Sequence, residues 1–345
     1  KKMSGIIRIS DFKNKSAISA SRIDSFLECT MKYGFRYLLK CPDTSNDGAS
    51  RGSVCHDIFE ILADKKYKSK VKEIISEKTT KNDKALWKLV YSYAQKYNVS
   101  DEENLNIIDE FIVNGLKSEF YGPSNTVESY TEKEFDFEYE DPALGINYRC
   151  KGFIDKIFKL KDENTGALYL ECKDFKSSKV KFDKEKIENN NQTIIYQLAL
   201  KRFLFPDLEL RNFSFIFLKF PQKPIQVANL LSDVQLQGYE HWLTDIQKRI
   251  NNFSEKNLES NFAANNETLK MTRCGKEGFK KDGSPYFICQ AQLPMDYYVL
   301  LNSKKEVIKS SHKLDLEMGE GEFVEKRRYT GCRYFFDKNE NRIRV

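Results

Sequence analysis

Residues 132–176 alternate apolar and polar side chains in three successive segments, and this pattern limits the fold more than any other stretch of the sequence. In the first segment, "EKEFDFEYE", the rings of Phe135, Phe137 and Tyr139 alternate with acids. The second segment, "INYRCKGFIDKIFKLK", is separated from the third, "LYLECKDFK", by the turn "DENTGA". Because residues i and i+2 of a strand share a face, we expect three strands here, the first of them half-buried.

Helical patterns surround these strands. Apolar residues recur at helical spacing over residues 21–40, from about residue 53, through the lysine-rich stretch 65–120, and over 184–204 and 231–253. One more alternating strand, "NFSFIFLKF", follows the fourth helical stretch. This order predicts an α/β protein with a mixed central sheet flanked by helices. The expected segments are N-terminal helices (1–64), a helical insertion (65–130), the core (131–225), an amphipathic helix packing on the core (226–262) and a small C-terminal subdomain with cysteines and aromatics (263–345).

The charge balance and the apolar segments restrict the functional class only loosely. The formal net charge is +6, but 51 acids are interspersed with 57 bases, so a polyanionic partner is only weakly indicated. No apolar run is long enough for a membrane span, and the N-terminus lacks a signal-peptide segment, so we expect a cytoplasmic protein from a bacterium, an archaeon or a phage-infected cell. No G-x-x-x-x-G-K-[ST] motif is present, so any helicase activity must come from another protein.

The stretch "ECKDFKSSK", residues 171–179, contains an acid, a spacer and a lysine twice, in overlapping frames. The acids Glu171 and Asp174 are three positions apart and would point to opposite faces of a strand, so only one frame can serve a given site. Asp155 lies among apolar residues of the preceding strand, where a bound Mg²⁺ would offset the cost of its burial. Two acids holding a metal beside a lysine would suit phosphodiester hydrolysis, and solvated surface charges are the alternative.

The motifs "GFIDKI", "DFKSSK" and "NQTIIYQLAL" resemble the PD-(D/E)XK nuclease superfamily, whose core has a restriction-endonuclease-like fold. The resemblance is closest to the branch of RecB-type nuclease domains, the AddB nuclease and the Cas4 exonucleases. That branch reads D-[YF]-K-[TS]-[SG]-K on the catalytic strand and Q-x-x-x-Y on the next helix, here Gln192 and Tyr196. Further upstream it shows Ser-x-Ser, a cysteine and G-x-x-x-H. These upstream positions are Ser19, Ser21, Cys29, and Gly52 to His56.

The resemblance implies a role for each matched position. Asp155 and Asp174 would bind Mg²⁺ or Mn²⁺ together with the backbone carbonyl of Phe175, and His56 would be an additional ligand. Lys176 would be the catalytic lysine.

Two helix positions and one open choice complete the expected site. Gln192 and Tyr196 would line the site and hold the DNA strand or the lysine. Alternation along the strand suits Glu171 as the second acid, whereas the family pattern favours Asp174. A bulge between these two acids would let Glu171 join as a secondary ligand.

The cysteines leave three alternatives open. Many members of the branch hold a 4Fe–4S cluster with one N-terminal and three C-terminal cysteines. Cys29, Cys274, Cys289 and Cys332 would be that set here, but the usual closing C-x-x-C is absent. The four thiolates would bind an iron–sulfur cluster or a structural zinc ion, or they are cysteines without a metal. Cys55, Cys150 and Cys172 lie in apolar segments and are expected to be small core residues.

These observations predict a Mg²⁺- or Mn²⁺-dependent DNA nuclease. The resemblance favours an exonuclease acting on duplex ends or single strands in DNA repair, recombination or phage- or CRISPR-type DNA processing. A helicase, a recombinase or another DNA-processing protein would be its partner. The alternative is a catalytically silent nuclease-fold module that binds DNA or such a partner.

Overall fold

The structure is a computed structural model that describes residues 5–7, 12–14, 16–42, 47–254, 256, 258, 277–279, 285–287, 289–291 and 293–332. By its internal contacts the chain divides into two units. The first comprises residues 1–19 and 45–245, and the second comprises residues 20–44 and 246–345. Each unit is described separately below.

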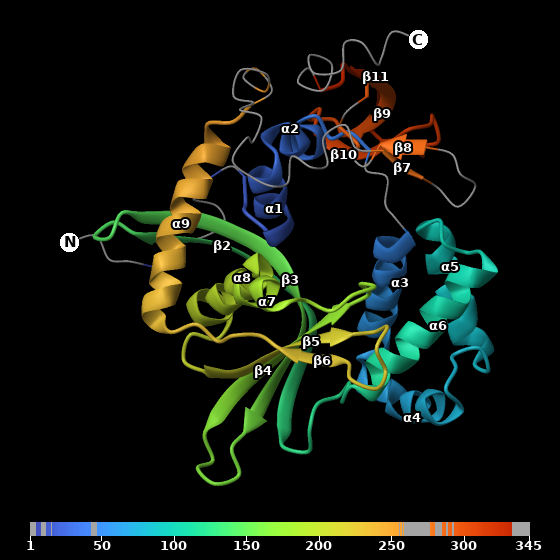
Figure 1. The fold of residues 1–345 in the computed structure, drawn as a ribbon, viewed down its shortest axis with the longest axis vertical. Coiled ribbons are helices and arrows are strands. Elements are labelled where there is room, and N and C mark those ends of the chain that lie inside the picture. The colour runs from blue at the N-terminus through green and yellow to red at the C-terminus, as the bar shows by residue number, and fades with distance from the viewer. Residues whose placement is uncertain are drawn as a thin grey trace. The chain divides into compact units, whose positions relative to one another are not determined.

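The first unit is built on a six-stranded sheet in the order β1-β2-β3-β4-β5-β6 (Figure 1). Strands β4 and β5 are parallel, and all other neighbours are antiparallel. This mixed sheet with helices around it confirms the expected fold class. The strands are β1 (Gly5–Ile7), β2 (Thr126–Asp141), β3 (Ile146–Lys161), β4 (Leu168–Lys176), β5 (Glu209–Phe217) and β6 (Ile225–Val227).

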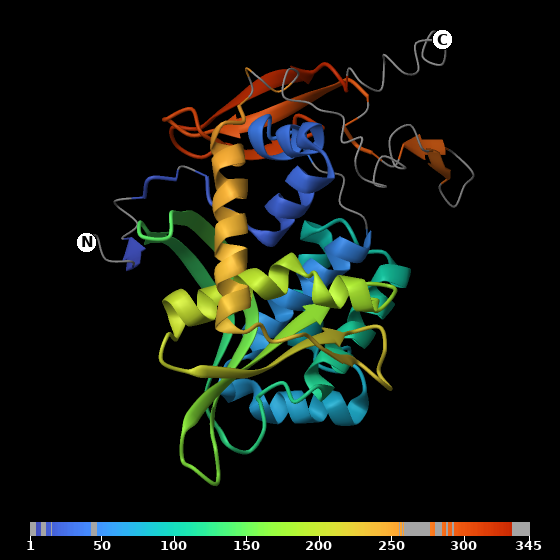
Figure 2. The same ribbon diagram turned by 60° about the vertical axis from the view of Figure 1, so that its left-hand side comes forward.

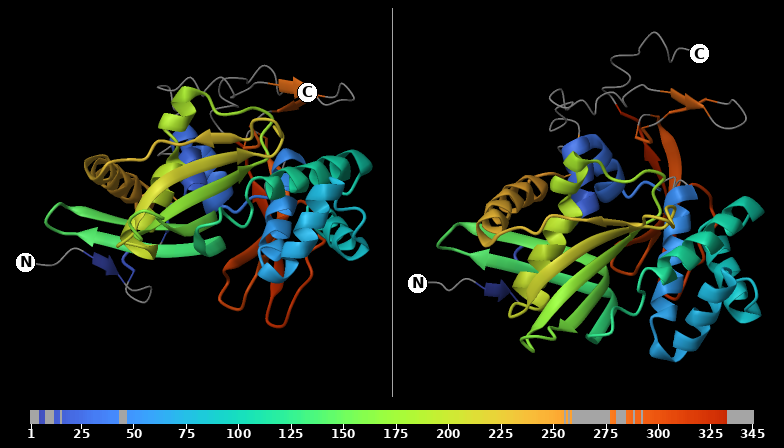
Figure 3. Two further views of the ribbon diagram at one scale, coloured as in Figure 1. Left: turned by 90° about the horizontal axis from the view of Figure 1, so that it is seen from below. Right: turned by 60° about the horizontal axis from the view of Figure 1, so that its bottom comes forward.

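Two groups of helices cover the two faces of this sheet, as Figures 2 and 3 show. One face packs against α3 and the helices of the lysine-rich region, in a core that includes Phe175 of β4 and Ile216 of β5. The other face packs against α8, whose Tyr196 contacts Phe135 of β2 and Phe213 of β5. The helices of the first group are α3 (Asp47–Leu62), α4 (Lys68–Glu77), α5 (Lys84–Lys96) and α6 (Glu102–Lys117).

Three predicted helices differ from the structure, either in where the helix begins or in a break within it. Residues 184–204 are not one helix but α7 (Lys184–Glu188), α8 (Asn191–Ala199) and a π-helical turn η4 (Leu200–Leu204). The break occurs because the side chain of Asn190 caps α8, accepting a hydrogen bond from the Thr193 amide at 3.1 Å. The helix predicted to start near residue 53 begins earlier, at Asp47, so its first turns include glycine and serine residues.

The second unit begins with the third corrected prediction, a helix over residues 21–40. It is interrupted at Cys29, whose backbone is extended, and forms α1 (Ala20–Glu28), α2 (Thr30–Tyr33) and a π-helical turn η2 (Gly34–Leu38). A three-stranded sheet in the order β10-β9-β11 packs its Tyr297, Val299 and Tyr329 against Phe35. The remaining elements are β7 (Glu277–Phe279), β8 (Pro285–Phe287), β9 (Met295–Leu301), β10 (Val307–Ser311) and β11 (Phe323–Tyr329).

Helix α9 (Asp233–Asn251) matches the predicted amphipathic segment 231–253, and its last residues belong to the second unit by their contacts. Cys55, Cys150 and Cys172 have no solvent exposure, as the sequence indicated for core residues. Among the described residues, no helix is both long and apolar enough to cross a membrane.

Candidate active site

Two buried aspartates stand side by side on neighbouring strands of the sheet. The last paired residues of the antiparallel β3–β4 ladder are Lys156 and Lys173, and Asp155 and Asp174 are the next residue on each strand. Asp155 is 6% exposed and Asp174 is 1% exposed. The Asp155 carboxylate accepts a hydrogen bond from the backbone amide of Phe175 at 2.7 Å, which links β3 to β4 directly beside Asp174.

A chain of hydrogen bonds joins β4 to α8. The Lys176 ammonium lies 2.6 Å from Asp174 Oδ2 and donates to Gln192 Oε1 at 2.6 Å. The amide nitrogen of Gln192 is 2.7 Å from both Asp174 Oδ1 and the Tyr196 hydroxyl, and it donates to each. Gln192 and Tyr196 are i and i+4 on one helix face, so a single turn of α8 holds the acid and the lysine of the strand.

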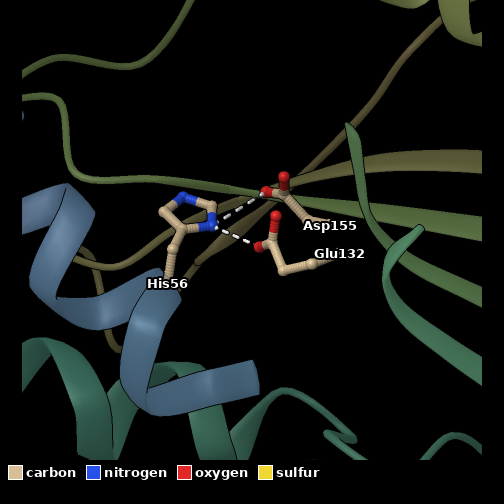
Figure 4. A group of neighbouring side chains, drawn as sticks. All are labelled: His56, Glu132 and Asp155. Carbon is tan, nitrogen blue, oxygen red and sulfur yellow. Dashed lines mark hydrogen bonds and ion pairs between the residues drawn. The ribbon is translucent and has the colours of Figure 1, made fainter. Parts of the chain in front are cut away.

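A second group of side chains meets Asp155 from another direction (Figure 4). His56 projects from α3, and its Nδ1 atom lies 2.9 Å from Glu132 Oε1 and 3.8 Å from Asp155 Oδ2. One ligand atom from each of these three residues lies within 4.8 Å of the other two. A nitrogen and two carboxylates at this spacing could hold a divalent cation. Octahedral ligands about 2.1 Å from an ion would lie about 3.0 Å apart, close to the first of these separations.

Glu132 was not among the residues singled out from the sequence. Its neighbours Thr131 and Lys133 pair with Lys156 and Ile154, so Glu132 stands opposite Asp155 across the strands. Its backbone φ is +47°, a left-handed conformation in the middle of a strand. Such a conformation is costly for a residue with a side chain, and it is found more often where function requires it. No local sequence motif predicts a role for Glu132, because its position in the site depends on the register between β2 and β3.

Burial and like charges perturb the ionisation of the whole cluster. Burial, followed by the charge of Asp155, raises the pKa of Asp174 to about 6. Burial also raises the pKa of Asp155, against the lowering effect of His56 and Lys176. Burial alone would lower the pKa of His56, but Asp155 and the hydrogen bond with Glu132 outweigh it and raise that pKa to about 9. In neutral solution the imidazolium of His56 therefore balances part of the negative charge.

The two overlapping frames of "ECKDFKSSK" point to opposite faces of β4. Lys173, in the frame of Glu171, is buried on the far side and donates to the carbonyl of Ser118 at 2.8 Å. Glu171 is half-exposed, and β4 pairs regularly with β3 from Glu171 to Lys173, so no bulge brings Glu171 round to Asp174. The register irregularity that does occur lies between Leu170 and Glu171, in the ladder with β5. The structure thus brings Asp174 and Lys176, and not Glu171, to the other predicted residues.

The upstream motif and the cysteines are distributed over both units. Ser19 belongs to the first unit and Ser21 to the second, where the Ser21 hydroxyl accepts a hydrogen bond from Tyr37 at 3.3 Å. Cys274 lies outside the described residues. The other three cysteines of the predicted set lie in the second unit, near the buried Tyr329, whose pKa is raised first by burial and then by these thiols. The thiols acting on Tyr329 are Cys332, Cys41, Cys289 and Cys29.

Comparison with known proteins agrees with this geometry. The family model of the PD-(D/E)XK nuclease superfamily matches residues 17–276. The chain belongs to the PD-(D/E)XK nuclease superfamily. It is also 26% identical over 212 residues to one of the subunits of the ATP-dependent helicase/deoxyribonuclease of Clostridium perfringens. That match covers 55% of this chain and 18% of the relative, so the chain spans less than a fifth of the protein it resembles.

The residues present fit a divalent metal ion. Two carboxylates and an imidazole come together at Glu132, Asp155 and His56, and the Asp174 carboxylate interacts with Asp155 from the neighbouring strand; oxygen-rich sets of this kind suit Mg²⁺ or Mn²⁺. The Oδ2 atom of Asp174 is buried and pairs with the Lys176 ammonium at 2.6 Å.

Proposed function

We propose that this chain is a Mg²⁺- or Mn²⁺-dependent deoxyribonuclease and that the site centred on Asp155 and Asp174 carries the reaction. The observation that supports this best is the continuous connection from the Asp174–Lys176 pair through Gln192 to Tyr196, with His56 and Asp155 beside it. Acids, lysine, histidine and the helix residues are thereby held together on four different elements, α3, β3, β4 and α8. Membership of a nuclease superfamily supports the same reaction class.

The protein groups have distinct tasks in this proposal. Asp155, Asp174, His56, Glu132 and the carbonyl of Phe175 would hold the metal. A bound divalent ion lowers the pKa of an attacking water and offsets charge on the phosphoryl oxygens. The Phe175 carbonyl is assigned by family resemblance, whereas its amide is already engaged with Asp155.

Lys176 and two residues of α8, Gln192 and Tyr196, would position the reacting groups and stabilise charge. Lys176 is fixed by two contacts of 2.6 Å, so its ammonium is oriented before substrate arrives. From there it can orient the attacking water and stabilise negative charge that develops on the phosphate. Gln192 holds Lys176 and Asp174 at once, and the Tyr196 hydroxyl accepts the second N–H of the same amide. Loss of Gln192 should therefore disturb both charged groups.

The finer assignments follow from the resemblance and from the named relative. We propose exonucleolytic action on DNA ends or single strands, as in the RecB-, AddB- and Cas4-like branch. The relative's name couples a helicase with a deoxyribonuclease, which supports a helicase or another DNA-processing protein as partner. The five segments expected from the sequence, and roles in repair, recombination or phage- or CRISPR-type processing, are part of the same proposal.

The test is digestion of end-labelled single- and double-stranded DNA in Mg²⁺, Mn²⁺ or EDTA. The variants are Asp174→Ala and, as a control on the opposite face of the same strand, Glu171→Ala. We expect metal-dependent release of label by the wild type and the Glu171 variant, and none by the Asp174 variant. A wild type that binds DNA but never cleaves it would favour the alternative of a silent binding module.

The cysteines call for a separate measurement. A metal centre held by Cys29, Cys274, Cys289 and Cys332 stays a prediction, supported by the gathering of three of these thiols near Tyr329. Iron and zinc content of anaerobically purified protein, with the Cys29→Ser variant beside it, separates an iron–sulfur cluster, a zinc site and metal-free cysteines.

A further inference from the structure

The second unit carries a cluster of cations around one aromatic ring that the proposed catalytic site does not use. The guanidinium carbon of Arg22 lies 5.0 Å from the centre of the Tyr37 ring, and that of Arg36 lies 5.5 Å from it. Lys40 follows Tyr37 by three positions in the chain, and burial, followed by the charge of Arg22, lowers the pKa of Lys40. Arg36 is exposed, and Arg22, Tyr37 and Lys40 are half-exposed. These four residues are called the Tyr37 cluster below.

A series of aromatic rings packs against the Tyr37 ring and holds it in place. Tyr37 contacts Tyr33 at 5.0 Å, and Tyr33 contacts Phe26 at 5.2 Å, with ring centres as reference points. Phe26 in turn contacts Phe253 at 5.8 Å. Tyr33 is 1% exposed and Phe26 is 3% exposed, so Tyr37 is the half-exposed end of a buried series of rings.

Two backbone features fix the position of the cluster. Arg36 and Tyr37 lie in the π-helical turn η2, a rare conformation that is frequent at functional sites. Lys40 follows with a left-handed φ of +54°. The Tyr37 hydroxyl donates to Ser21 at 3.3 Å, which gives the second serine of the Ser-x-Ser motif a structural purpose.

The charges of the cluster suit an anionic partner. Two guanidinium groups lie over one ring, with Lys40 following in the chain, and positive charge of this kind attracts polyanions. Tyr37 is half-exposed, so part of its side chain is in contact with solvent. A rigid, accessible ring flanked by guanidinium groups suits a chain of phosphates and bases, because bases stack on aromatic rings while cations bind the phosphates.

We propose that the Tyr37 cluster is a contact surface for single-stranded nucleic acid, with Tyr37 stacking on a base and Arg22, Arg36 and Lys40 binding adjacent phosphates. This inference rests on the proposed function for the identity of the substrate, but it concerns a surface outside the catalytic site. Its recognition is independent of sequence, because every base offers a ring face and every nucleotide a phosphate.

The test measures binding of a fluorescein-labelled oligothymidylate of about fifteen nucleotides. Binding is read by fluorescence anisotropy in EDTA over a series of salt concentrations. We expect Tyr37→Ala to weaken binding about 5- to 150-fold, as for loss of one stacked base. Tyr37→Phe keeps the ring and should bind within about twofold of the wild type. Arg22→Ala with Arg36→Ala should lower the slope of log K against log salt by about 1.4, or about 0.7 for each phosphate contact.

Two controls keep this test decisive. The double variant Lys84→Ala with Lys88→Ala removes the same charge from exposed positions of α5 and should leave the salt slope nearly unchanged. Arg36→Gln alters one exposed side chain, so thermal melting should be unchanged while the slope falls by about 0.7. Wild-type slopes in the arginine variants together with wild-type affinity in Tyr37→Ala would overturn the inference. An equal loss in the Lys84/Lys88 control would also overturn it.

The outcome is separable from that of the proposed function. Binding is measured in EDTA, where no metal-dependent cleavage occurs, whereas the nuclease proposal depends on cleavage by the wild type in Mg²⁺ or Mn²⁺. A wild type that cleaves DNA while the cluster variants bind normally would refute this inference alone. A wild type that binds through the cluster and never cleaves would refute the nuclease proposal alone.

Discussion

Replacing Asp174 by asparagine should stabilise the metal-free protein while it abolishes the effect of the metal. The pKa of Asp174 is raised to about 6 by burial and by Asp155, about two units above an ordinary aspartate. At about 1.4 kcal/mol per unit, the ionised carboxylate costs about 3 kcal/mol of folding free energy at pH 7. Both states are protonated below about pH 4, so the cost is absent there; it grows as pH rises from about 4 to about 6 and is fully present above about pH 6.

Asparagine has nearly the same shape and no charge, so it should recover most of this free energy. The ion pair with Lys176 is already part of this figure, because it lowers the pKa of Asp174 against burial and the charge of Asp155. In a unit of this size, about 3 kcal/mol corresponds to a rise in melting temperature of about 6–12 °C. Thermal melting in EDTA at pH 7.5 and at pH 4.5 measures it, and only the higher pH should show the full increase.

Addition of Mn²⁺ should reverse the order of the two proteins. The wild type should gain stability by mass action, whereas the Asp174→Asn variant should gain little because a ligand is missing. Glu171→Gln is the matched control and should melt like the wild type under each condition. The reasoning would be refuted if Asp174→Asn melted below the wild type in EDTA at pH 7.5, since the carboxylate would then be stabilising without a metal.

Three further outcomes follow from the contacts of the site and its supporting core. Since the pKa of His56 is raised to about 9, its protonated form stabilises the metal-free fold below about pH 6.5 and that contribution is lost as pH rises through 9; His56→Gln should flatten denaturant-measured stability over this window. Glu132→Gln should weaken Mn²⁺ binding about 10- to 100-fold by calorimetry, with activity partly restored at high metal concentration. Gly115→Ala should lower the free energy of unfolding by about 1–3 kcal/mol, because its Cβ would overlap the Phe59 ring, and urea denaturation measures the loss.

Most of the fold and much of the candidate site could be predicted from the strand pattern and the short motifs. Alternation located β2, β3, β4 and β5, because each of these strands buries one face or both in the core and the hydrophobic period survives in the sequence. The acids of "GFIDKI" and "DFKSSK" come together because β3 and β4 are joined by a short turn and pair as neighbours. Alternation alone could not choose between Glu171 and Asp174, because both faces of β4 are covered by helices and each frame places a lysine two residues after its acid.

The features that were not predicted from the sequence depend on non-local geometry. Glu132 precedes Asp155 by 23 positions and joins the site only through the register of β2 on β3 and its own left-handed backbone. The interruptions at Cys29 and Asn190 were also missed, because both stretches keep apolar residues at helical spacing across the break. In each case the local pattern is compatible with a longer element, and a capping side chain or an extended residue decides otherwise.

The charges of the candidate site are compensated by groups of the protein itself. Asp155 and Asp174 are kept out of water side by side, and the compensating charges are the His56 imidazolium and the Lys176 ammonium. If His56 binds the metal, as proposed, the ion would have to displace a proton from it, so affinity should increase with pH up to about 9. Lys176 is held by Gln192 as well as by Asp174, so it stays in place when a metal takes over the carboxylate. The helix α8 thus keeps the lysine oriented independently of the acid, which is what a reaction needing both a metal and a fixed cation requires.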